Sequence, residues 1–377
     1  MINHYDLLVL GAGPYGYAAA AYARERGIRT QVVGRPMSFW RENMPADMFL
    51  RSGTDWHLDA LEEDTFEAYF EDCGLRPTDH DPIPIRVFCD YTDWFRQRKG
   101  FDVDERLVAE LTKSGDAFVA RLEDDSTITA ERVLAAPGIR HFTSLPAWHE
   151  LVPAELRSHT CDLVSFDELA GARVAIIGGR QSAYEWAALL CDHDAEQVAV
   201  IHRHPTPAFA KISWAFVDSY IDQTLGLRGW WRRLPAQTRA SILAEFWSVG
   251  RLALEHWLVP RLAPGVVTAH AGCAVVEVSS DGDTVTLVLS DATTLVVDHV
   301  VFATGYRADF EKVPYLGPVL DQVTVTDGWP ELNEDFETSL PGLSVIGFAS
   351  TRDFGPFYGF TKGCPSAARI AVDAMLG

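Results

Sequence analysis

The stretch YDLLVLGAGPYG at residues 5–16 decides the fold of this chain. It begins with a short apolar run typical of a buried strand and ends in three closely spaced glycines. An alanine-rich segment at residues 17–26 and a second apolar run at residues 30–33 follow. The order of strand, glycine turn, helix and strand predicts a βαβ unit with a site for the pyrophosphate of a dinucleotide.

Each glycine of this turn has a distinct expected role. Gly11 permits the tight turn, Gly13 leaves the backbone bare for the pyrophosphate, and Gly16 allows the helix to pack against the strand. Pro14 and Tyr15 open the helix, whose free N–H groups and positive end would hold the phosphates. A glycine turn without a ligand is the alternative, and the complete strand–turn–helix context disfavours it.

The same pattern returns 167 residues later. An apolar run at residues 172–177 leads into the turn GGRQSA, which starts at Gly178, and a helix and a strand are predicted at 184–191 and 197–201. Arg180 stands where the second glycine is expected, and its side chain either grips the pyrophosphate or fills its place. We therefore predict an α/β protein with two Rossmann-like dinucleotide-binding domains.

The remaining segments place the domain boundaries. Alternating runs near residues 106–134 and 274–302 predict β-meander insertions, and the last strand and helix return the chain to the first domain. We expect a discontinuous first domain at 1–165 and 290–377. The second domain would span 166–289 and carry a helical insertion at 205–264.

The helical insertion is rich in tryptophan. Residues 238–257 have apolar side chains at helical spacing, which is typical of amphipathic helices. Three interpretations stand side by side: ordinary core packing, the wall of an apolar substrate pocket, and a contact between copies in a homo-oligomer.

Charge and cysteine usage exclude several classes of protein. The net charge of -21 argues against nucleic acid and against an anionic membrane surface as partners. The six cysteines form no CxxC motif and no metal-ligand cluster with histidine, so we expect no metal site and reduced thiols. With no recognisable signal peptide or membrane span, a cytoplasmic location is expected.

The order of the motifs resembles the flavoprotein monooxygenases that carry FAD and NADPH on two Rossmann-type domains. The two turns are followed by Asp298-xxx-Phe-Ala-Thr-Gly-Tyr306, which is similar to an element of the N-hydroxylating and flavin-containing monooxygenases. The fingerprint of the Baeyer–Villiger branch is not intact, since Pro153 occupies its phenylalanine position. Disulfide-reductase chemistry is disfavoured because CxxC is absent and Phe348 follows Gly347.

The resemblance implies roles for individual residues. Expected FAD contacts are Gly11, Gly13, Pro14, Tyr15, Gly16, Arg35, Trp40, Arg51, Trp56, Gly347, Phe348 and Tyr358. Expected NADPH contacts are Gly178, Arg180, Gln181, Ser182, Arg203, Thr304 and Gly305. Arg203 would hold the 2′-phosphate, with His202 and His204 as helpers, which favours NADPH over NADH.

The implied activity is insertion of one oxygen atom from O2 into a small-molecule substrate through a C4a-hydroperoxyflavin. N-hydroxylation or a related heteroatom oxidation is expected, and the sequence does not choose between nitrogen, sulfur and carbonyl substrates. His57 would donate a proton to the peroxide, and Phe357 and Phe360 would join the residues that line the flavin. The alternatives are an FAD oxidase or dehydrogenase that has lost NADPH, with Arg180 blocking its site, and a non-catalytic flavin-binding protein.

Overall fold

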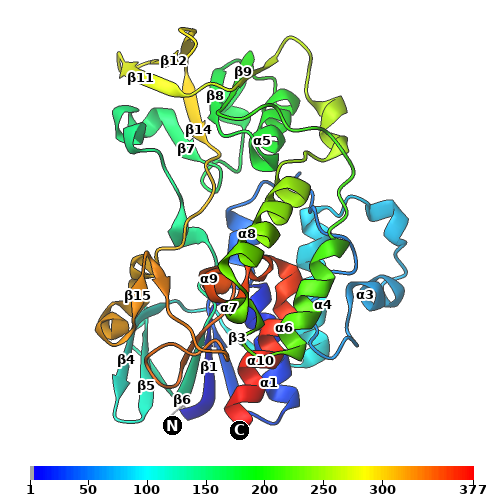
Figure 1. Ribbon diagram of the computed structural model, residues 1–377, viewed down its shortest axis with the longest axis vertical. Coiled ribbons are helices and arrows are strands. Elements are labelled where there is room, and N and C mark those ends of the chain that lie inside the picture. Colours follow the sequence, from blue (N-terminus) through cyan, green and yellow to red (C-terminus); the bar gives the residue numbers. More distant parts are fainter. Residues whose placement is uncertain (1–3) are drawn as a thin grey trace.

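The first sheet carries the first glycine turn near its centre (Figure 1). The computed structural model describes residues 4–377, and the strands of this sheet run in the order β3-β2-β1-β6-β5-β4, with β17 beside the end of β6. The pairs of β1 with β2 and β6 are parallel, whereas β4, β5 and β6 form an antiparallel meander. The strands are β1 (His4–Leu10), β2 (Thr30–Val33), β3 (Val103–Asp104), β4 (Val108–Ser114), β5 (Ala117–Leu122), β6 (Thr127–Ala135) and β17 (Leu343–Val345).

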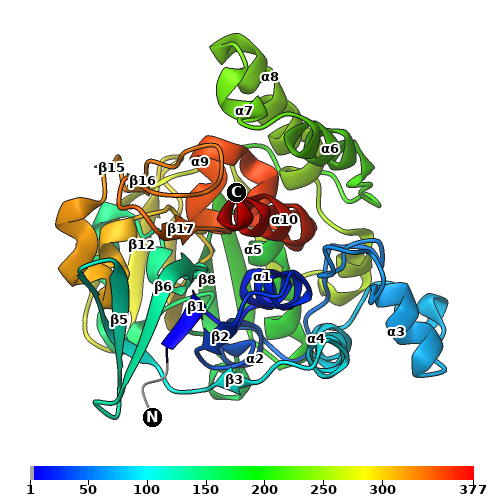
Figure 2. The ribbon, with the colours of Figure 1, turned by 90° about the horizontal axis from the view of Figure 1, so that it is seen from below.

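Helices from both ends of the chain pack beside this sheet. The first helix, α1, lies next to the last, α10, in both views (Figures 1 and 2), and the Tyr22 hydroxyl donates a hydrogen bond to the Asp373 carboxylate at 2.9 Å. The helices of this part are α1 (Pro14–Glu25), α2 (Ser38–Glu42), α3 (Phe66–Asp72), α4 (Ile85–Lys99), α9 (Thr351–Phe354) and α10 (Cys364–Leu376). Among residues 4–377, no helix combines the length and the apolar character that a bilayer crossing requires.

The second sheet is fully parallel and carries the second glycine turn. Its order is β10-β9-β8-β14-β7, and helix α5 follows β8. A small antiparallel sheet of β11, β12 and β13 accompanies it, whereas a two-stranded sheet of β15 and β16 lies near β4 and β5 of the first sheet (Figure 1). The elements are β7 (Arg157–His159), β8 (Arg173–Ile177), α5 (Gln181–Asp192), β9 (Gln197–His202), β10 (Val267–Ala271), β11 (Val275–Ser280), β12 (Val285–Leu289), β13 (Thr294–Val297), β14 (His299–Phe302), β15 (Val325–Thr326) and β16 (Trp329–Pro330).

The sheets divide the chain differently from the predicted domain boundaries. β7 lies before residue 166 and β14 lies after residue 289, yet both pair within the second sheet. The predicted boundaries, by contrast, assign both strands to the first domain. Strand pairing over long sequence distance is invisible to local pattern, since a short apolar run fits the edge of either sheet.

The helical insertion is divided into several short helical elements. Its elements are α6 (Asp218–Gly226), α7 (Trp230–Arg233), α8 (Ala236–Glu245), a π-helical turn (Phe246–Arg251) and a 3-10 segment (His256–Arg261). Trp247 and Val249 are 37% and 44% exposed, so the apolar stripe does not continue inward. At Gly250 the Trp214 ring occupies the place of a side chain, 2.4 Å from an ideal Cβ, and this close approach accompanies the change of helical geometry.

The insertion packs against the first domain although its sequence interrupts the second. Trp214, Trp231 and Phe246 are buried in the same core cluster as the strands of the first sheet. The Trp231 indole N–H donates to the carbonyl oxygen of Arg352 at 3.0 Å, and Figures 1 and 2 show α6 beside α10. Core packing is therefore one role of these aromatic residues. The last part of the insertion packs on the second domain instead, because Leu254 and Leu258 are buried in the core cluster that contains α5.

Candidate functional site

The first turn contains glycines with opposite steric demands. At Gly11, φ is +117° and a Cβ would lie 2.2 Å from the carbonyl oxygen of Ala136. At Gly16, a Cβ would lie 1.8 Å from the carbonyl oxygen of Gly11. No heavy atom lies within 4 Å of a Cβ built on Gly13. Packing therefore requires Gly11 and Gly16, whereas the bare backbone of Gly13 leaves room for a ligand.

The N-terminus of α1 presents unpaired donors to that room. Gly13 caps the helix without a side-chain hydrogen bond, and Pro14 occupies the first helical position. The backbone N–H groups of Tyr15 and Gly16 have no acceptor among residues 4–377. Unpaired N–H groups at the positive end of a helix form an anion site suited to a pyrophosphate.

A cleft of about 560 Å³ opens at this helix end. It runs past the carboxyl ends of β1, β2, β6 and β17, where parallel sheets bind ligands, and its volume is typical of cofactor sites. Most of the predicted FAD contacts line it: Gly11, Gly13, Pro14, Tyr15, Gly16, Arg35, Trp40, Trp56, Gly347 and Phe348.

The cleft also includes residues that the sequence analysis missed. Pro137, Gly138 and Arg140 follow β6, and Asn43 and Ser52 lie in the loop after the end of α2. The first three could have been found, because they directly follow a strand whose carboxyl end meets the ends of β1 and β2. Asn43 and Ser52 carry no comparable signal.

Tyr15 ties the first turn to the end of the chain. Its hydroxyl lies 2.5 Å from the carbonyl oxygen of Tyr358 and 2.8 Å from that of Phe360. Its ring lies against Gly347, where an added Cβ would meet it at 3.4 Å. Burial raises the pKa of Tyr15 well above its usual range, so the hydroxyl stays a donor. The last loop is thereby fixed over the cleft.

Aromatic rings from three segments cover one end of the cleft. Trp56 and Phe360 line the cleft, and Trp214 of the insertion lies 5.8 Å from each of their rings. Phe246 adds a fourth ring, 5.4 Å from Phe360. Trp56 is only 5% exposed. This apolar cover over one end of the cleft suits a flat ring system.

Two predicted FAD contacts lie outside the cleft. The Arg51 guanidinium forms an ion pair with Glu255 at 3.2 Å and donates to the carbonyl oxygen of Gly250 at 2.9 Å. Tyr358 is fully buried, and its side chain is absent from the cleft lining. Both residues hold neighbouring segments in place, and the prediction of direct contact is not supported for either.

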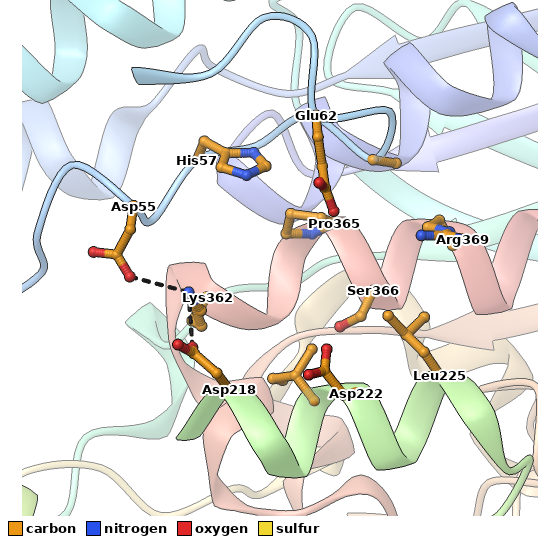
Figure 3. A pocket seen from close by; sticks show the side chains of 12 residues that line it. Asp55, His57, Glu62, Asp218, Asp222, Leu225, Lys362, Pro365, Ser366 and Arg369 are labelled. Carbon is orange, nitrogen blue, oxygen red and sulfur yellow. Dashed lines mark hydrogen bonds and ion pairs between the residues drawn. The ribbon is translucent and has the colours of Figure 1, made fainter. Parts of the chain in front are cut away.

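His57 lies in a different pocket from its neighbour Trp56. This pocket, of about 150 Å³, is lined by the loop at residues 55–62, α6 and the start of α10 (Figure 3). Lys362 bridges Asp55 at 3.1 Å and Asp218 at 2.8 Å beside it. Burial lowers the pKa of His57, which keeps the ring neutral near pH 7. The structure therefore places His57 outside the cleft that Trp56 lines, and does not support the predicted contact with the flavin.

The second turn repeats the steric design of the first. At Gly178, φ is +138° and a Cβ would lie 2.4 Å from the carbonyl oxygen of Ala303. A Cβ on Gly179 would lie 2.2 Å from the ring of His202. The N–H groups of Gln181 and Ser182 at the start of α5 have no acceptor among residues 4–377. This helix end is therefore a second anion site.

The Arg180 side chain leaves the turn instead of filling it. Its guanidinium lies 4.1 Å from the ring centroid of Trp247 in the π-helical turn. The Gln181 side chain points inward, where its amide donates to Glu185 at 2.8 Å and its oxygen accepts from the N–H of Glu255 at 3.0 Å. Only the backbone of Gln181 therefore remains for a phosphate.

The other predicted NADPH contacts surround the same edge of the second sheet. Arg203 is exposed at the end of β9 and has no ion pair among residues 4–377. The rings of His202 and His204 stack at 4.6 Å. Thr304 donates a hydrogen bond to the carbonyl oxygen of Ser144, and Gly305 follows it in the connection between the two sheets.

Together these features define a class: a protein with two helix-end anion sites on two Rossmann-like sheets and one apolar cleft. The cleft fits FAD, because Gly13 provides a bare cradle, Tyr15 and Gly16 provide orphan N–H donors, and the aromatic cover suits a flat ring system. The second turn has donors for the phosphates of a nicotinamide dinucleotide.

The family model described as pyridine nucleotide-disulphide oxidoreductase matches residues 5–224, and the chain belongs to this family. It is 28% identical over 207 residues to a ferredoxin–NADP reductase of Thermus thermophilus, covering 54% of each chain. It is 26% identical over 216 residues to an FAD-dependent urate hydroxylase of Xanthomonas campestris, covering 53% of this chain and 45% of that one. The chain thus spans about half the length of the curated relatives it matches.

Solved structures extend the similarity of fold to the whole chain. The ornithine N-hydroxylase of Kutzneria sp. 744 superposes with a TM-score of 0.80 and 17% identity over 99% of both chains. The fold is therefore that of the class B flavin monooxygenases. Membership of this family implies FAD and a nicotinamide dinucleotide as cofactors.

Proposed function

We propose that this oxidoreductase is an NADPH-reduced monooxygenase that transfers one oxygen atom of O2 to a heteroatom of a small-molecule substrate. When bound, FAD would accept hydride from the nicotinamide and activate dioxygen, which is the chemistry that the cofactor supplies. The observation that carries the proposal is the aromatic cover over the cleft, formed by Trp56, Trp214, Phe246 and Phe360. Oxygen transfer needs such a dry site, because water competes for reactive intermediates.

The chain's own residues would bind, orient and shield. Tyr15 and Gly16 would hold the FAD pyrophosphate with their N–H groups, and the bare backbone of Gly13 would let it approach. The N–H groups of Gln181 and Ser182 would hold the pyrophosphate of NADPH, and Arg203 its 2′-phosphate. Because the Arg180 side chain packs on Trp247, it does not block that position, which disfavours an oxidase that has lost NADPH.

The curated relatives favour a second candidate, electron transfer from reduced flavin to a protein acceptor. Ferredoxin–NADP reductases are among the sequence matches, and the hydride step would be the same. The buried state of Trp56 argues against it, because a protein acceptor needs a flavin edge near the surface.

The test is a measurement of coupling under air. The FAD-loaded protein is given NADPH together with amines, sulfides and ketones, and hydrogen peroxide released per NADPH consumed is followed. A monooxygenase releases less peroxide when its substrate is present and incorporates labelled oxygen from ¹⁸O2 into the product. Failure of NADPH to bleach the flavin anaerobically would contradict the proposal. Fast reduction with constant peroxide and efficient reduction of a ferredoxin would favour the second candidate.

A further inference from the structure

Three arginines gather where the helical insertion meets the second turn. Arg51 is satisfied by Glu255 and by backbone carbonyls of the insertion. Arg180 and Arg251 have neither an ion pair nor a hydrogen-bond acceptor among residues 4–377. The cluster therefore holds two guanidinium groups without an anion.

Trp247 places these two groups together. The guanidinium carbon of Arg180 lies 4.1 Å from its ring centroid and that of Arg251 lies 5.3 Å from it. Arg251 also lies 5.3 Å from the ring of Phe360, which lines the cofactor cleft. Because Arg180 caps α5, the pair lies between the second anion site and the covered end of the cleft.

The electrostatic cost of this arrangement is visible at Arg251. Burial, together with the like charges of Arg51 and Arg180, lowers the pKa of Arg251 to about 10. A half-buried cation beside other cations is unfavourable unless an anion compensates it. Stacking on Trp247 and Phe360 offsets only part of that cost.

We propose that Arg180 and Arg251, supported by Trp247, form a clamp for an oxyanion. The guanidinium fork matches the geometry of phosphate and carboxylate groups. The helical insertion would thereby supply a binding residue, Arg251, to the route between the second turn and the cleft. The proposal extends the proposed function, since the anion is either the pyrophosphate of NADPH or an anionic group of the substrate.

Calorimetry with two probes tests the clamp without turnover. Inorganic pyrophosphate and NADP⁺ are titrated separately into FAD-loaded wild-type protein and into Arg251→Gln. The matched control is Arg239→Gln, which removes one charge from α8 of the same insertion, where Arg239 has no ion pair among residues 4–377. We expect pyrophosphate affinity to fall at least tenfold in Arg251→Gln and less than twofold in the control.

The second probe identifies the source of the anion. A parallel loss of NADP⁺ affinity assigns the clamp to the nicotinamide cofactor, whereas unchanged NADP⁺ affinity assigns it to the substrate. Pyrophosphate affinity that is unmeasurable in the wild type, or equal in Arg251→Gln and the control, overturns the proposal. If Arg251→Gln loses FAD or unfolds, Arg180→Gln and Arg251→Lys take its place, with loss expected for the first and partial retention for the second. Because binding is measured without oxygen chemistry, the clamp can hold even where monooxygenation fails.

Discussion

The two glycine turns are nearly identical in backbone and differ in what they leave open. Gly13 has φ of -92° and ψ of -173°, and Arg180, at the matching position, has -109° and -172°. Any residue adopts this extended conformation. At Gly13, glycine therefore provides room for the ligand and is not required by the backbone geometry.

The comparison distinguishes the turn position that requires glycine from the position at which another residue is accepted. Gly11 and Gly178 both have positive φ and both lie against a carbonyl oxygen, of Ala136 and Ala303 respectively. Two positions after them, the chain carries a bare backbone in one turn, at Gly13, and a cationic side chain in the other, at Arg180. The first turn is thus built to let a pyrophosphate lie against the chain, and the second has an additional charged group at its rim.

Substituting the first glycine of each turn, Gly11 or Gly178, should disrupt the two sites independently. Gly11→Val should abolish FAD retention, because its Cβ would collide with the Ala136 carbonyl at an unfavourable φ. Gly178→Val should keep flavin near the wild-type amount and lose NADP⁺ affinity more than tenfold. Flavin absorbance per chain and NADP⁺ calorimetry measure the two effects. As a control, Gly226→Val, at an exposed glycine with open surroundings, should change neither flavin content nor NADP⁺ affinity. Equal loss of flavin in both turn variants would show that the two sites are not independent.

The two βαβ units also differ in the arginine that follows their second strand. The second strand of the second unit ends beside this exposed arginine, whereas the first unit has Arg35 paired with Glu42 at 3.8 Å. Arg203→Gln should lower the preference for NADPH over NADH by about 10- to 100-fold, corresponding to about 1.4 to 2.8 kcal/mol. The ratio of anaerobic flavin-reduction efficiencies measures it. An unchanged ratio would remove Arg203 from 2′-phosphate recognition.

Helices α1 and α5 also differ at matching buried positions, where Ala18 in one corresponds to Glu185 in the other. Burial raises the pKa of Glu185 to about 7, despite Gln181 and Arg261 nearby. The unfolded chain ionises this carboxyl near pH 4.5, so the folded state loses stability as pH rises from about 4.5 to about 7. Glu185→Gln should remove up to about 3 kcal/mol of that pH dependence.

Urea unfolding at a series of pH values measures the effect of Glu185→Gln. The exposed Glu168→Gln is the control and should follow the wild type. If wild type and Glu185→Gln show parallel stability curves between pH 4.5 and pH 7, Glu185 does not have a raised pKa.

His57→Ala is expected to have the smallest effect. The side chain lies in the pocket of Lys362 and α6, away from the cleft that Trp56 lines. Peroxide released per NADPH should stay within about 20% of the wild type, whereas Trp56→Ala should raise it several-fold by admitting water. A rise in His57→Ala comparable to that in Trp56→Ala would restore a role for His57 at the flavin.

The sequence could predict features that local pattern determines. Strand, turn and helix occur next to one another in each unit, so the glycine spacing was enough to locate both helix-end anion sites. The most accurate predictions, such as β2 at Thr30–Val33 and the glycines of the cleft, are of this kind.

Contacts between distant segments could not be predicted in the same way. The directions of Arg180 and Arg51 depend on the insertion, whose Trp247 and Glu255 meet them only after folding. The opposite orientations of Trp56 and His57 depend on which helices pack on either side of an irregular loop. Trp214 and Trp231 of the insertion joined the first core, where Trp231 bonds to Arg352 of α9, whereas Trp257 packs against the core cluster of α5.

The central claim is that one chain holds a flavin and a nicotinamide dinucleotide at the same time, at two sterically similar turns. Native mass spectrometry of the protein with FAD and NADP⁺ tests this most directly. The account predicts a complex of one chain with one FAD and one NADP⁺, from which Gly178→Val loses only NADP⁺. A wild-type protein that retains no FAD, or in which NADP⁺ displaces it, would contradict the account.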